Sequence, residues 1–231
     1  MGYLLLVRHG ESRWNTVNKF TGWVDVPLSE KGVREAMRIA QRVHRLRLDV
    51  AFTSHLERAH ETLLVILSNQ HCTGIFLHDH EHNGLEYPYK PDRNEIPVYT
   101  SWLMNERNYG ALQGMNKAKA ARKYGKEKVL EWRRSFDARP PRGESLKDVY
   151  ARVVPYFRSK VWPAIRAKKN VLVVAHGNTL RAIIKYLENI PADRIANLEL
   201  KPGQPHIYQY KGGKLERKFE GYSFTRPVAW K

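Results

Sequence analysis

The stretch Leu4-Leu5-Leu6-Val7-Arg8-His9-Gly10 places an arginine, a histidine and a glycine directly after four apolar residues. Four apolar residues are too few to span a membrane and are typical of a buried strand in a parallel sheet. Gly10 allows a tight turn and a close approach of a ligand to the backbone, at the edge where open α/β sheets bind ligands. The stretch therefore predicts a central strand whose carboxyl end presents Arg8 and His9 to a crevice suited to phosphate chemistry.

The same design occurs near the other end of the chain, where Val171-Leu172-Val173-Val174-Ala175 runs into His176-Gly177-Asn178. Apolar residues then follow at helical spacing, at Leu180, Ile183, Ile184 and Leu187. Either histidine taken alone is compatible with an ordinary residue at a strand end. Two strands that both end in His-Gly favour one shared site.

Strands and helices alternate along the rest of the chain. A helix that begins near Leu56 would carry Arg58 in its first turn, beside the carboxyl end of the preceding strand, and would aim it at the same crevice. The alternation predicts an α/β fold with a mainly parallel sheet and helices on both faces. The other predicted elements are helices after Ser29 and after Ser145, strands at residues 50–54 and 206–210, a return after Gly212-Gly213, and an exposed basic helix at 117–135.

Two stretches depart from this alternation. Residues 71–97 hold four histidines and three prolines, a composition typical of a loop. Histidines interleaved with Asp79 and Glu81 are compatible with a metal site, but a histidine-rich loop fits the same pattern and is favoured. Residues 221–231 form a short basic and aromatic tail. We expect one domain over residues 1–231, with a loop at 71–97 and a C-terminal tail at 221–231.

Composition narrows the class of protein. No apolar run among the 231 residues approaches the roughly 18 residues of a membrane-spanning helix. The single cysteine, Cys72, and the absence of a signal-peptide pattern favour a cytoplasmic protein. The net charge of +17 attracts anions. Because the basic residues are spread through every segment, a small anionic substrate is favoured over a specific nucleic acid.

The motifs Leu6-Val7-Arg8-His9-Gly10-Glu11 and Ala175-His176-Gly177-Asn178 resemble those of the histidine phosphatase superfamily. Within it, three further segments resemble the 2,3-bisphosphoglycerate-dependent phosphoglycerate mutases: Phe-Thr-Gly-Trp at 20–23, Asn-Glu-Arg-Asn-Tyr-Gly-Ala-Leu-Gln-Gly at 105–114, and Glu-Trp-Arg-Arg at 131–134. The resemblance runs from about residue 4 to about residue 188 and implies a single catalytic domain with an insertion at residues 71–97. It implies a phosphoglycerate mutase-like fold and an isomerase of glycolysis and gluconeogenesis, which interconverts 3-phosphoglycerate and 2-phosphoglycerate through a phosphohistidine.

The resemblance also implies catalytic roles. His9 would be the nucleophile that becomes phosphorylated, and Glu106 the general acid and base for the substrate hydroxyl. Arg8, Arg58 and His176 would surround the phosphoryl oxygens, since phosphoryl transfer depends on positioning and on neutralising negative charge. Such a cluster can replace a metal, so no metal is expected. Without the surrounding match, the residue type of Glu106 would favour an ion-pair partner of a nearby arginine.

The carboxylate end of the substrate needs a second set of groups, which the resemblance also implies. These are Tyr109, Lys117, Arg133 and Arg134 for the carboxylate, and Asn15, Thr21, Gly22 and Asn178 for hydrogen bonds, with Arg107, Asn108 and Gly177 completing the binding set. By composition alone, the basic residues among them are also compatible with a solvated helix face. The resemblance further implies 2,3-bisphosphoglycerate as primer and a homo-oligomer, a dimer or tetramer, with no membrane partner.

Other activities stay open at this point. A phosphatase of the same superfamily would pass the phosphoryl group from His9 to water, and a bisphosphoglycerate synthase would use the same groups. Segments 105–114 and 132–134 favour the mutase. The tail at 221–231 has no clear match in the mutases, which is compatible with phosphatase activity. A catalytically silent basic protein that binds polyanions is a remote alternative, which the intact His9, Arg58, Glu106 and His176 disfavour.

Overall fold

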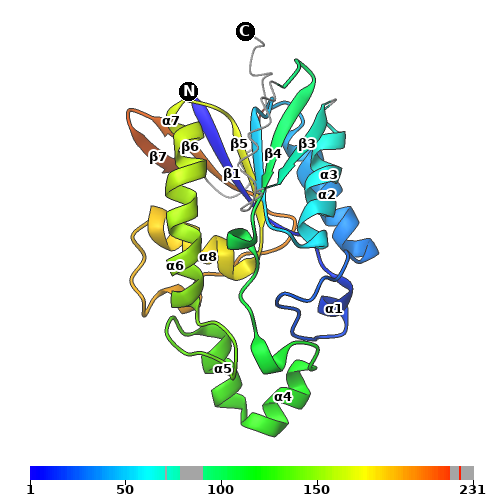
Figure 1. Cartoon of the computed structure of the whole chain (residues 1–231), viewed down its shortest axis with the longest axis vertical. Coiled ribbons are helices and arrows are strands. Elements are labelled where there is room, and N and C mark those ends of the chain that lie inside the picture. Colours follow the sequence, from blue (N-terminus) through cyan, green and yellow to red (C-terminus); the bar gives the residue numbers. More distant parts are fainter. Residues whose placement is uncertain (71, 79–90, 219–223, 225–231) are drawn as a thin grey trace.

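The computed structural model describes residues 1–70, 72–78, 91–218 and 224. The described residues contain one seven-stranded sheet, in the order β3-β4-β2-β5-β1-β6-β7 (Figure 1). Five strands are parallel, and β6 and β7 extend the sheet antiparallel beyond β1. The predicted mainly parallel sheet is thereby confirmed. The strands are β1 (Gly2–Arg8), β2 (Val50–Thr53), β3 (Thr73–His78), β4 (Glu95–Thr100), β5 (Val171–Ala175), β6 (His206–Lys211) and β7 (Lys214–Arg217).

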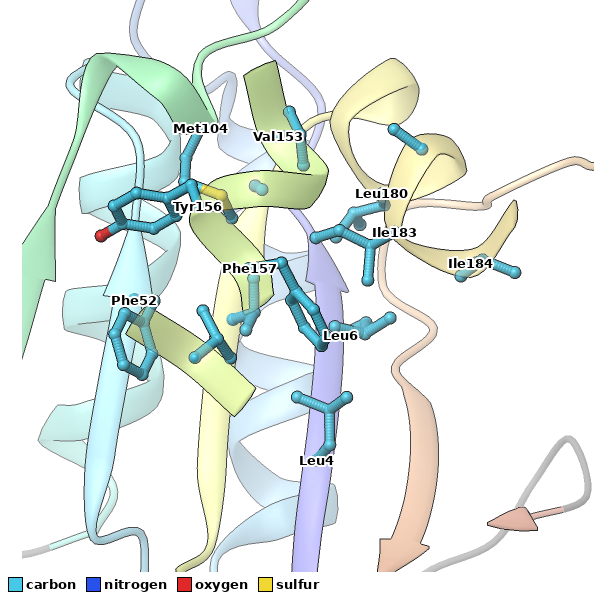
Figure 2. Close-up of a cluster of buried hydrophobic side chains, with 14 of the residues drawn as sticks. Leu4, Leu6, Phe52, Met104, Val153, Tyr156, Phe157, Leu180, Ile183 and Ile184 are labelled. Carbon is cyan, nitrogen blue, oxygen red and sulfur yellow. The ribbon is translucent and has the colours of Figure 1, made fainter. Parts of the chain in front are cut away.

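Helices cover both faces of the sheet. Leu4 and Leu6 of β1 face α6 (Leu146–Tyr156) and α8 (Gly177–Leu187). Val153 of α6 and Ile183 of α8 belong to the same hydrophobic cluster as these leucines (Figure 2). The alternate residues of β1 pack against α2 (Glu30–Val43) and α3 (Glu57–Ser68) on the other face. A strand buried on both sides needs a continuous apolar run, which explains the leucine-rich start of the chain. Among the described residues, none of the helices is both long and apolar enough to cross a membrane.

The predicted helix starts after Ser29 and Ser145 are confirmed. The Ser29 hydroxyl accepts a hydrogen bond from the backbone N–H of Gly32 at 3.1 Å. Ser145 and Asp148 form a reciprocal capping box at the start of α6. The remaining short helical elements are α1 (Arg13–Thr16), α7 (Trp162–Arg166), the 3₁₀ turns η1 (Trp102–Met104), η2 (Gly110–Leu112) and η4 (Ile195–Asn197), and the π-helical turn η3 (Phe157–Val161) that links α6 to α7.

A helical hairpin projects beyond the carboxyl ends of the parallel strands, at the bottom of Figure 1. It consists of α4 (Lys117–Tyr124) and α5 (Lys126–Arg134), which are separated by Gly125 in a left-handed conformation with φ of 88°. Trp132 of α5 packs with Phe20 in a separate hydrophobic cluster. The prediction of one exposed basic helix over 117–135 is therefore wrong. Glycine breaks it, and one side of each helix is buried.

The prediction of a loop over the whole of residues 71–97 is also wrong. Its first part forms β3, and its last residues begin β4, which pairs with β3 in parallel. The apolar run Ile75-Phe76-Leu77 carries the strand signal that the surrounding histidines and prolines obscure. Residues 71 and 79–90, with most of the histidines of the metal hypothesis, lie outside the described residues. So does the tail, except Phe224, whose ring packs 5.0 Å from that of Tyr3.

Candidate active site

A cavity of about 290 Å³ opens at the carboxyl ends of β1 and β5 and is bounded by α4 and α5. Parallel pairing sets Arg8 opposite Ala175, and the backbone N–H of His9 donates to the Ala175 carbonyl at 3.0 Å. The ends of the two strands therefore deliver both His-Gly motifs to one place. The cavity gathers thirteen of the predicted residues: Arg8, His9, Asn15, Thr21, Gly22, Arg58, Glu106, Tyr109, Lys117, Arg133, Arg134, Gly177 and Asn178.

His9 is buried at the inner end of this cavity. Its Nδ1 lies 2.6 Å from the carbonyl oxygen of Gly10. Because a carbonyl can only accept, this contact assigns the hydrogen to Nδ1 and leaves the lone pair on Nε2. Burial, followed by the charges of Arg58 and Arg8, holds the pKa of His9 well below its usual value. At neutral pH His9 is therefore an uncharged imidazole with a nucleophilic Nε2.

Gly10 is required by the close packing behind His9. A Cβ atom at this position would lie 2.3 Å from the backbone oxygen of Gly32 in α2. The backbone N–H of Gly10 donates to Thr62 Oγ1 in α3 at 3.1 Å. The turn after β1 is thus fixed between two helices, which orients the imidazole that it carries.

Two arginines lie beside His9. Arg58 is fully buried in the first turn of α3, and its Nη2 donates to the Gly22 carbonyl at 2.8 Å. Burial lowers the pKa of Arg58 to about 10, so it stays charged at neutral pH. Arg8 Nη1 donates to the Leu200 carbonyl at 2.8 Å. The Nε atoms of both arginines are buried without a hydrogen-bond partner among the described residues, as are Thr21 Oγ1 and His176 Nδ1. Such atoms are rare in folded proteins, and the oxygens of a phosphoryl group would satisfy them.

His176 is completely buried, with its ring centroid 5.0 Å from that of His9. It is not among the residues that line the cavity. Its Nε2 is 2.7 Å from Ser54 Oγ, and this hydroxyl accepts a hydrogen bond from the backbone N–H of Leu56 at 3.1 Å. The serine hydrogen is therefore available to Nε2, and its donation to Nε2 would place the imidazole hydrogen on Nδ1. Burial, then the charges of Arg58 and His9, lowers the pKa of His176 well below its usual value.

Glu106 is held at the N-terminus of α8. Its Oε1 accepts three hydrogen bonds, from the backbone N–H of Arg107 at 2.7 Å and from the backbone and side-chain nitrogens of Asn178 at 3.1 and 3.0 Å. Its backbone carbonyl accepts from Trp23 Nε1 at 2.5 Å and from Arg152 Nη2 at 2.9 Å. The carboxylate is fixed through one oxygen, which leaves Oε2 for proton exchange with a ligand.

Arg107 and Asn108 lie outside the described lining of the cavity. The fully buried Arg107 donates to the Tyr109 hydroxyl at 3.1 Å, and its guanidinium stacks 4.7 Å from the centre of the Tyr109 ring. Burial raises the pKa of Tyr109, but the charge of Arg107 and two hydrogen bonds outweigh it and lower that pKa overall. The Asn108 side chain accepts from the backbone N–H of Gly110 at 2.7 Å and shapes the turn. Arg107 therefore supports Tyr109, and Asn108 shapes the turn that follows it.

Cations also line the outer end of the cavity, where Lys117 begins α4 and Arg133 and Arg134 end α5. Burial, then the charge of Arg133, lowers the pKa of Lys117. One cluster of positive charge at the strand ends and another on the helical hairpin therefore line one cavity, which Glu106 and Tyr109 also line. This arrangement suits a small ligand with an anionic group at each end.

Sequence reasoning missed seven residues of the lining: Lys19, Phe20, Arg181, Glu199, Leu200, Lys201 and Pro202. Arg181 follows Asn178 by three positions, so the helical periodicity of α8 contains the signal that places it on the same face. Burial and the charge of Arg134 lower the pKa of Arg181 to about 10. Residues 199–202 belong to the connection between η4 and β6, whose composition contains no comparable signal.

The fold and the site define a class of phosphate-handling α/β proteins. Among solved structures, YhfR from Bacillus stearothermophilus has the same fold, with a TM-score of 0.74, 24% identity, and coverage of 96% of this chain and 97% of that chain. The family model of the histidine phosphatase superfamily (branch 1) matches residues 4–79 and 90–220. The chain belongs to this superfamily, which confirms the resemblance found in the sequence. The gap between the two matched ranges is narrower than the predicted insertion at 71–97.

Relatives of higher sequence identity are 2,3-bisphosphoglycerate-dependent phosphoglycerate mutases. The relative from Methanosarcina acetivorans is 45% identical over 236 aligned positions, which cover 94% of this chain and 95% of the relative. The relative from Gloeothece citriformis is 48% identical and covers 90% of this chain and 94% of its own length. The chain therefore matches mutases along almost its whole length.

Proposed function

We propose that the chain is a 2,3-bisphosphoglycerate-dependent phosphoglycerate mutase, which interconverts 3-phosphoglycerate and 2-phosphoglycerate. The observation that carries the proposal is the pair of cationic ends in one cavity, with the neutral His9 at the inner end and the cluster of Lys117, Arg133 and Arg134 at the outer end. A phosphoglycerate has a phosphate at one end and a carboxylate at the other, and both fit such a cavity.

In the proposed first step, the phosphoryl group on Nε2 of His9 passes to the hydroxyl oxygen at C2 of 3-phosphoglycerate. The P–N bond breaks as the new P–O bond forms, and the hydroxyl proton moves to Glu106. Arg8 and Arg58 neutralise the charge on the equatorial phosphoryl oxygens, while His176 donates from Nδ1. The products are 2,3-bisphosphoglycerate and a neutral His9.

In the second step, the bisphosphate turns within the cavity so that its C3 phosphate meets His9. Nε2 takes this phosphoryl group, Glu106 returns its proton to the C3 oxygen, and 2-phosphoglycerate leaves. The cluster at the outer end holds the carboxylate in both orientations. The binding set is completed by Asn15, Thr21, Gly22, Tyr109, Gly177 and Asn178 at the cavity wall, with Arg107 supporting Tyr109 and Asn108 shaping the turn to Gly110.

The proposal includes four further statements. The chain acts as one catalytic domain over residues 1–231. Small amounts of 2,3-bisphosphoglycerate prime it by phosphorylating His9, and the arginines carry out the charge neutralisation that a metal supplies elsewhere. The enzyme works in the cytoplasm as a homo-oligomer, without a specific nucleic-acid partner. These statements rest on the resemblance and the charge distribution of the site.

The test follows conversion of 3-phosphoglycerate to 2-phosphoglycerate in the presence of a chelator, with and without 2,3-bisphosphoglycerate, while released phosphate is recorded. We expect primed, chelator-resistant isomerisation, and we expect His9→Ala to abolish it. His44→Ala is the matched control, because His44 is exposed at the end of α2. Phosphate release without isomerisation would instead identify a phosphatase of the same superfamily, and turnover by His9→Ala would refute the phosphohistidine route.

A further inference from the structure

The connection from Leu198 to Pro202 forms one wall of the cavity and is held by three arginines from three different elements. Arg8 donates to the Leu200 carbonyl, and Arg181 Nε donates to the Leu198 carbonyl at 2.9 Å. The third contact differs in kind, because Arg134 Nη2 meets a side-chain carboxylate, Glu199 Oε1, at 3.1 Å. An ion pair therefore joins α5 to this wall within the lining of the cavity.

Glu199 and Glu106 are the two carboxylates among the described residues that line the cavity. Glu106 is fixed by three N–H donors. Glu199 is 65% exposed and pairs with a guanidinium that is itself one-third exposed. An exposed pair of this kind is weakly bound and exchanges readily with another anion. Its partner is one of the arginines that the proposed function assigns to the substrate carboxylate.

We propose that Glu199 is a specificity-determining residue, which competes with the substrate carboxylate for Arg134. The proposal rests on the proposed function, because that function supplies a ligand with a carboxylate at the outer end. When the ligand binds, one carboxylate replaces the other and the guanidinium stays paired throughout. When the bisphosphate turns between the two transfer steps, Glu199 takes Arg134 back, so the released end does not rebind at once.

Glu199→Gln tests this proposal. If Glu199 competes with the substrate carboxylate, the variant binds 3-phosphoglycerate more tightly, whereas if Glu199 helped to bind the substrate, the variant would bind it more weakly. By calorimetric titration, we expect the variant to bind 3-phosphoglycerate about two- to fivefold more tightly, the range set by an exposed ion pair. Glycerol 3-phosphate, which has the phosphate and lacks the carboxylate, should bind equally to the variant and to the wild type. In the Arg134→Ala background the gain from Glu199→Gln should disappear.

Asp137→Asn is the matched control for the change in net charge. Asp137 is 67% exposed and pairs with Lys147 at 3.4 Å, outside the lining of this cavity. It should leave the affinity for 3-phosphoglycerate unchanged. An equal gain for both ligands, an equal gain in Asp137→Asn, or no gain in Glu199→Gln would each overturn the proposal. If the wild type binds 3-phosphoglycerate without isomerising it, a carboxylate-dependent gain in Glu199→Gln still supports competition at Arg134, while the proposed mutase activity fails.

Discussion

Arg152 in α6 is the residue whose removal tests most directly how Glu106 is positioned. Its guanidinium binds both carboxylate oxygens of Glu144, at 2.9 and 3.0 Å, and donates to the carbonyls of Leu103 and Glu106 at 2.6 and 2.9 Å. The Arg152 side chain is 9% exposed and that of Glu144 is 21% exposed. Arg152→Met retains an unbranched apolar side chain at this position and removes all four hydrogen bonds.

Removing one partner of a buried ion pair costs about 3–5 kcal/mol of unfolding free energy, because the other charge stays buried without compensation. The Glu144 carboxylate keeps one donor, the backbone N–H of Asn108 at 2.8 Å, so we expect the lower end of this range, about 3 kcal/mol. For a chain of this length, that loss corresponds to a fall in Tm of about 6–12 °C. Since Glu106 also loses a backbone donor, we expect kcat to fall about 10- to 100-fold.

Arg139→Met is the matched control. Arg139 also binds a carboxylate through two hydrogen bonds, to Asp148 at 3.0 and 2.6 Å, but its side chain is 61% exposed. An exposed pair contributes about 0.2–1 kcal/mol, so its Tm should fall by less than about 4 °C. Thermal unfolding and steady-state kinetics below the transition measure both effects. Equal falls in Tm for the two variants would refute the argument from burial, and an unchanged kcat in Arg152→Met would show that Arg152 does not position Glu106.

Three further predictions concern the inner end of the cavity. Arg58→Ala should lower kcat by about 10² or more, as the loss of one preorganised cation does, and steady-state kinetics near the wild-type rate would contradict its contact with the phosphoryl group. Ser54→Ala should lower kcat about tenfold and change the ring ¹⁵N shifts of His176, because the Ser54 hydroxyl contacts His176 Nε2; unchanged shifts would contradict that contact. The pKa values of His9 and His176 are lowered in the folded state, so the unfolded chain binds more protons below about pH 6.5. The contribution of these two histidines to the unfolding free energy should be fully present above that pH and should be lost as pH falls through their folded pKa values. A Tm that increases as pH is lowered from 6.5 to 5 would contradict this sign.

The central strands were predictable because burial on both faces leaves a simple signal. Leu4 to Val7 and Val171 to Ala175 are continuous apolar runs, and each becomes a strand of the parallel sheet. β3 was not predicted because its short apolar run is flanked by histidines. The start of β4 was not predicted because this strand contains a proline. The break between α4 and α5 occurs at one glycine, Gly125, which has a positive φ. The two helices on either side of it pack against Phe20, a residue far away in the sequence, so no local pattern predicts the break.

The candidate site was predictable where a motif carries its residues, as in the Asn-Glu-Arg-Asn-Tyr-Gly segment at 105–110. Short-range sequence does not distinguish a residue that lines a cavity from one that supports it. Arg107 and Tyr109 are two positions apart, yet the tyrosine lines the cavity and the arginine stacks behind it. Contacts between distant segments, such as that of Ser54 with His176, depend on the register of β2 and β5 and leave no local pattern.

The inner end of the cavity shows how one buried environment can keep a histidine neutral and an arginine charged. Burial disfavours the charged form of every cation, but the groups start from different pKa values. The imidazole of His9 starts near 6.5, so burial makes it neutral and nucleophilic at physiological pH. The guanidinium of Arg58 starts at 12.5, and burial leaves its pKa at about 10, so it remains charged. A lysine in the same place would start about two units below arginine, so the same burial would bring it closer to losing its charge. Burial at this site therefore favours arginine over lysine as the cation beside a neutral histidine.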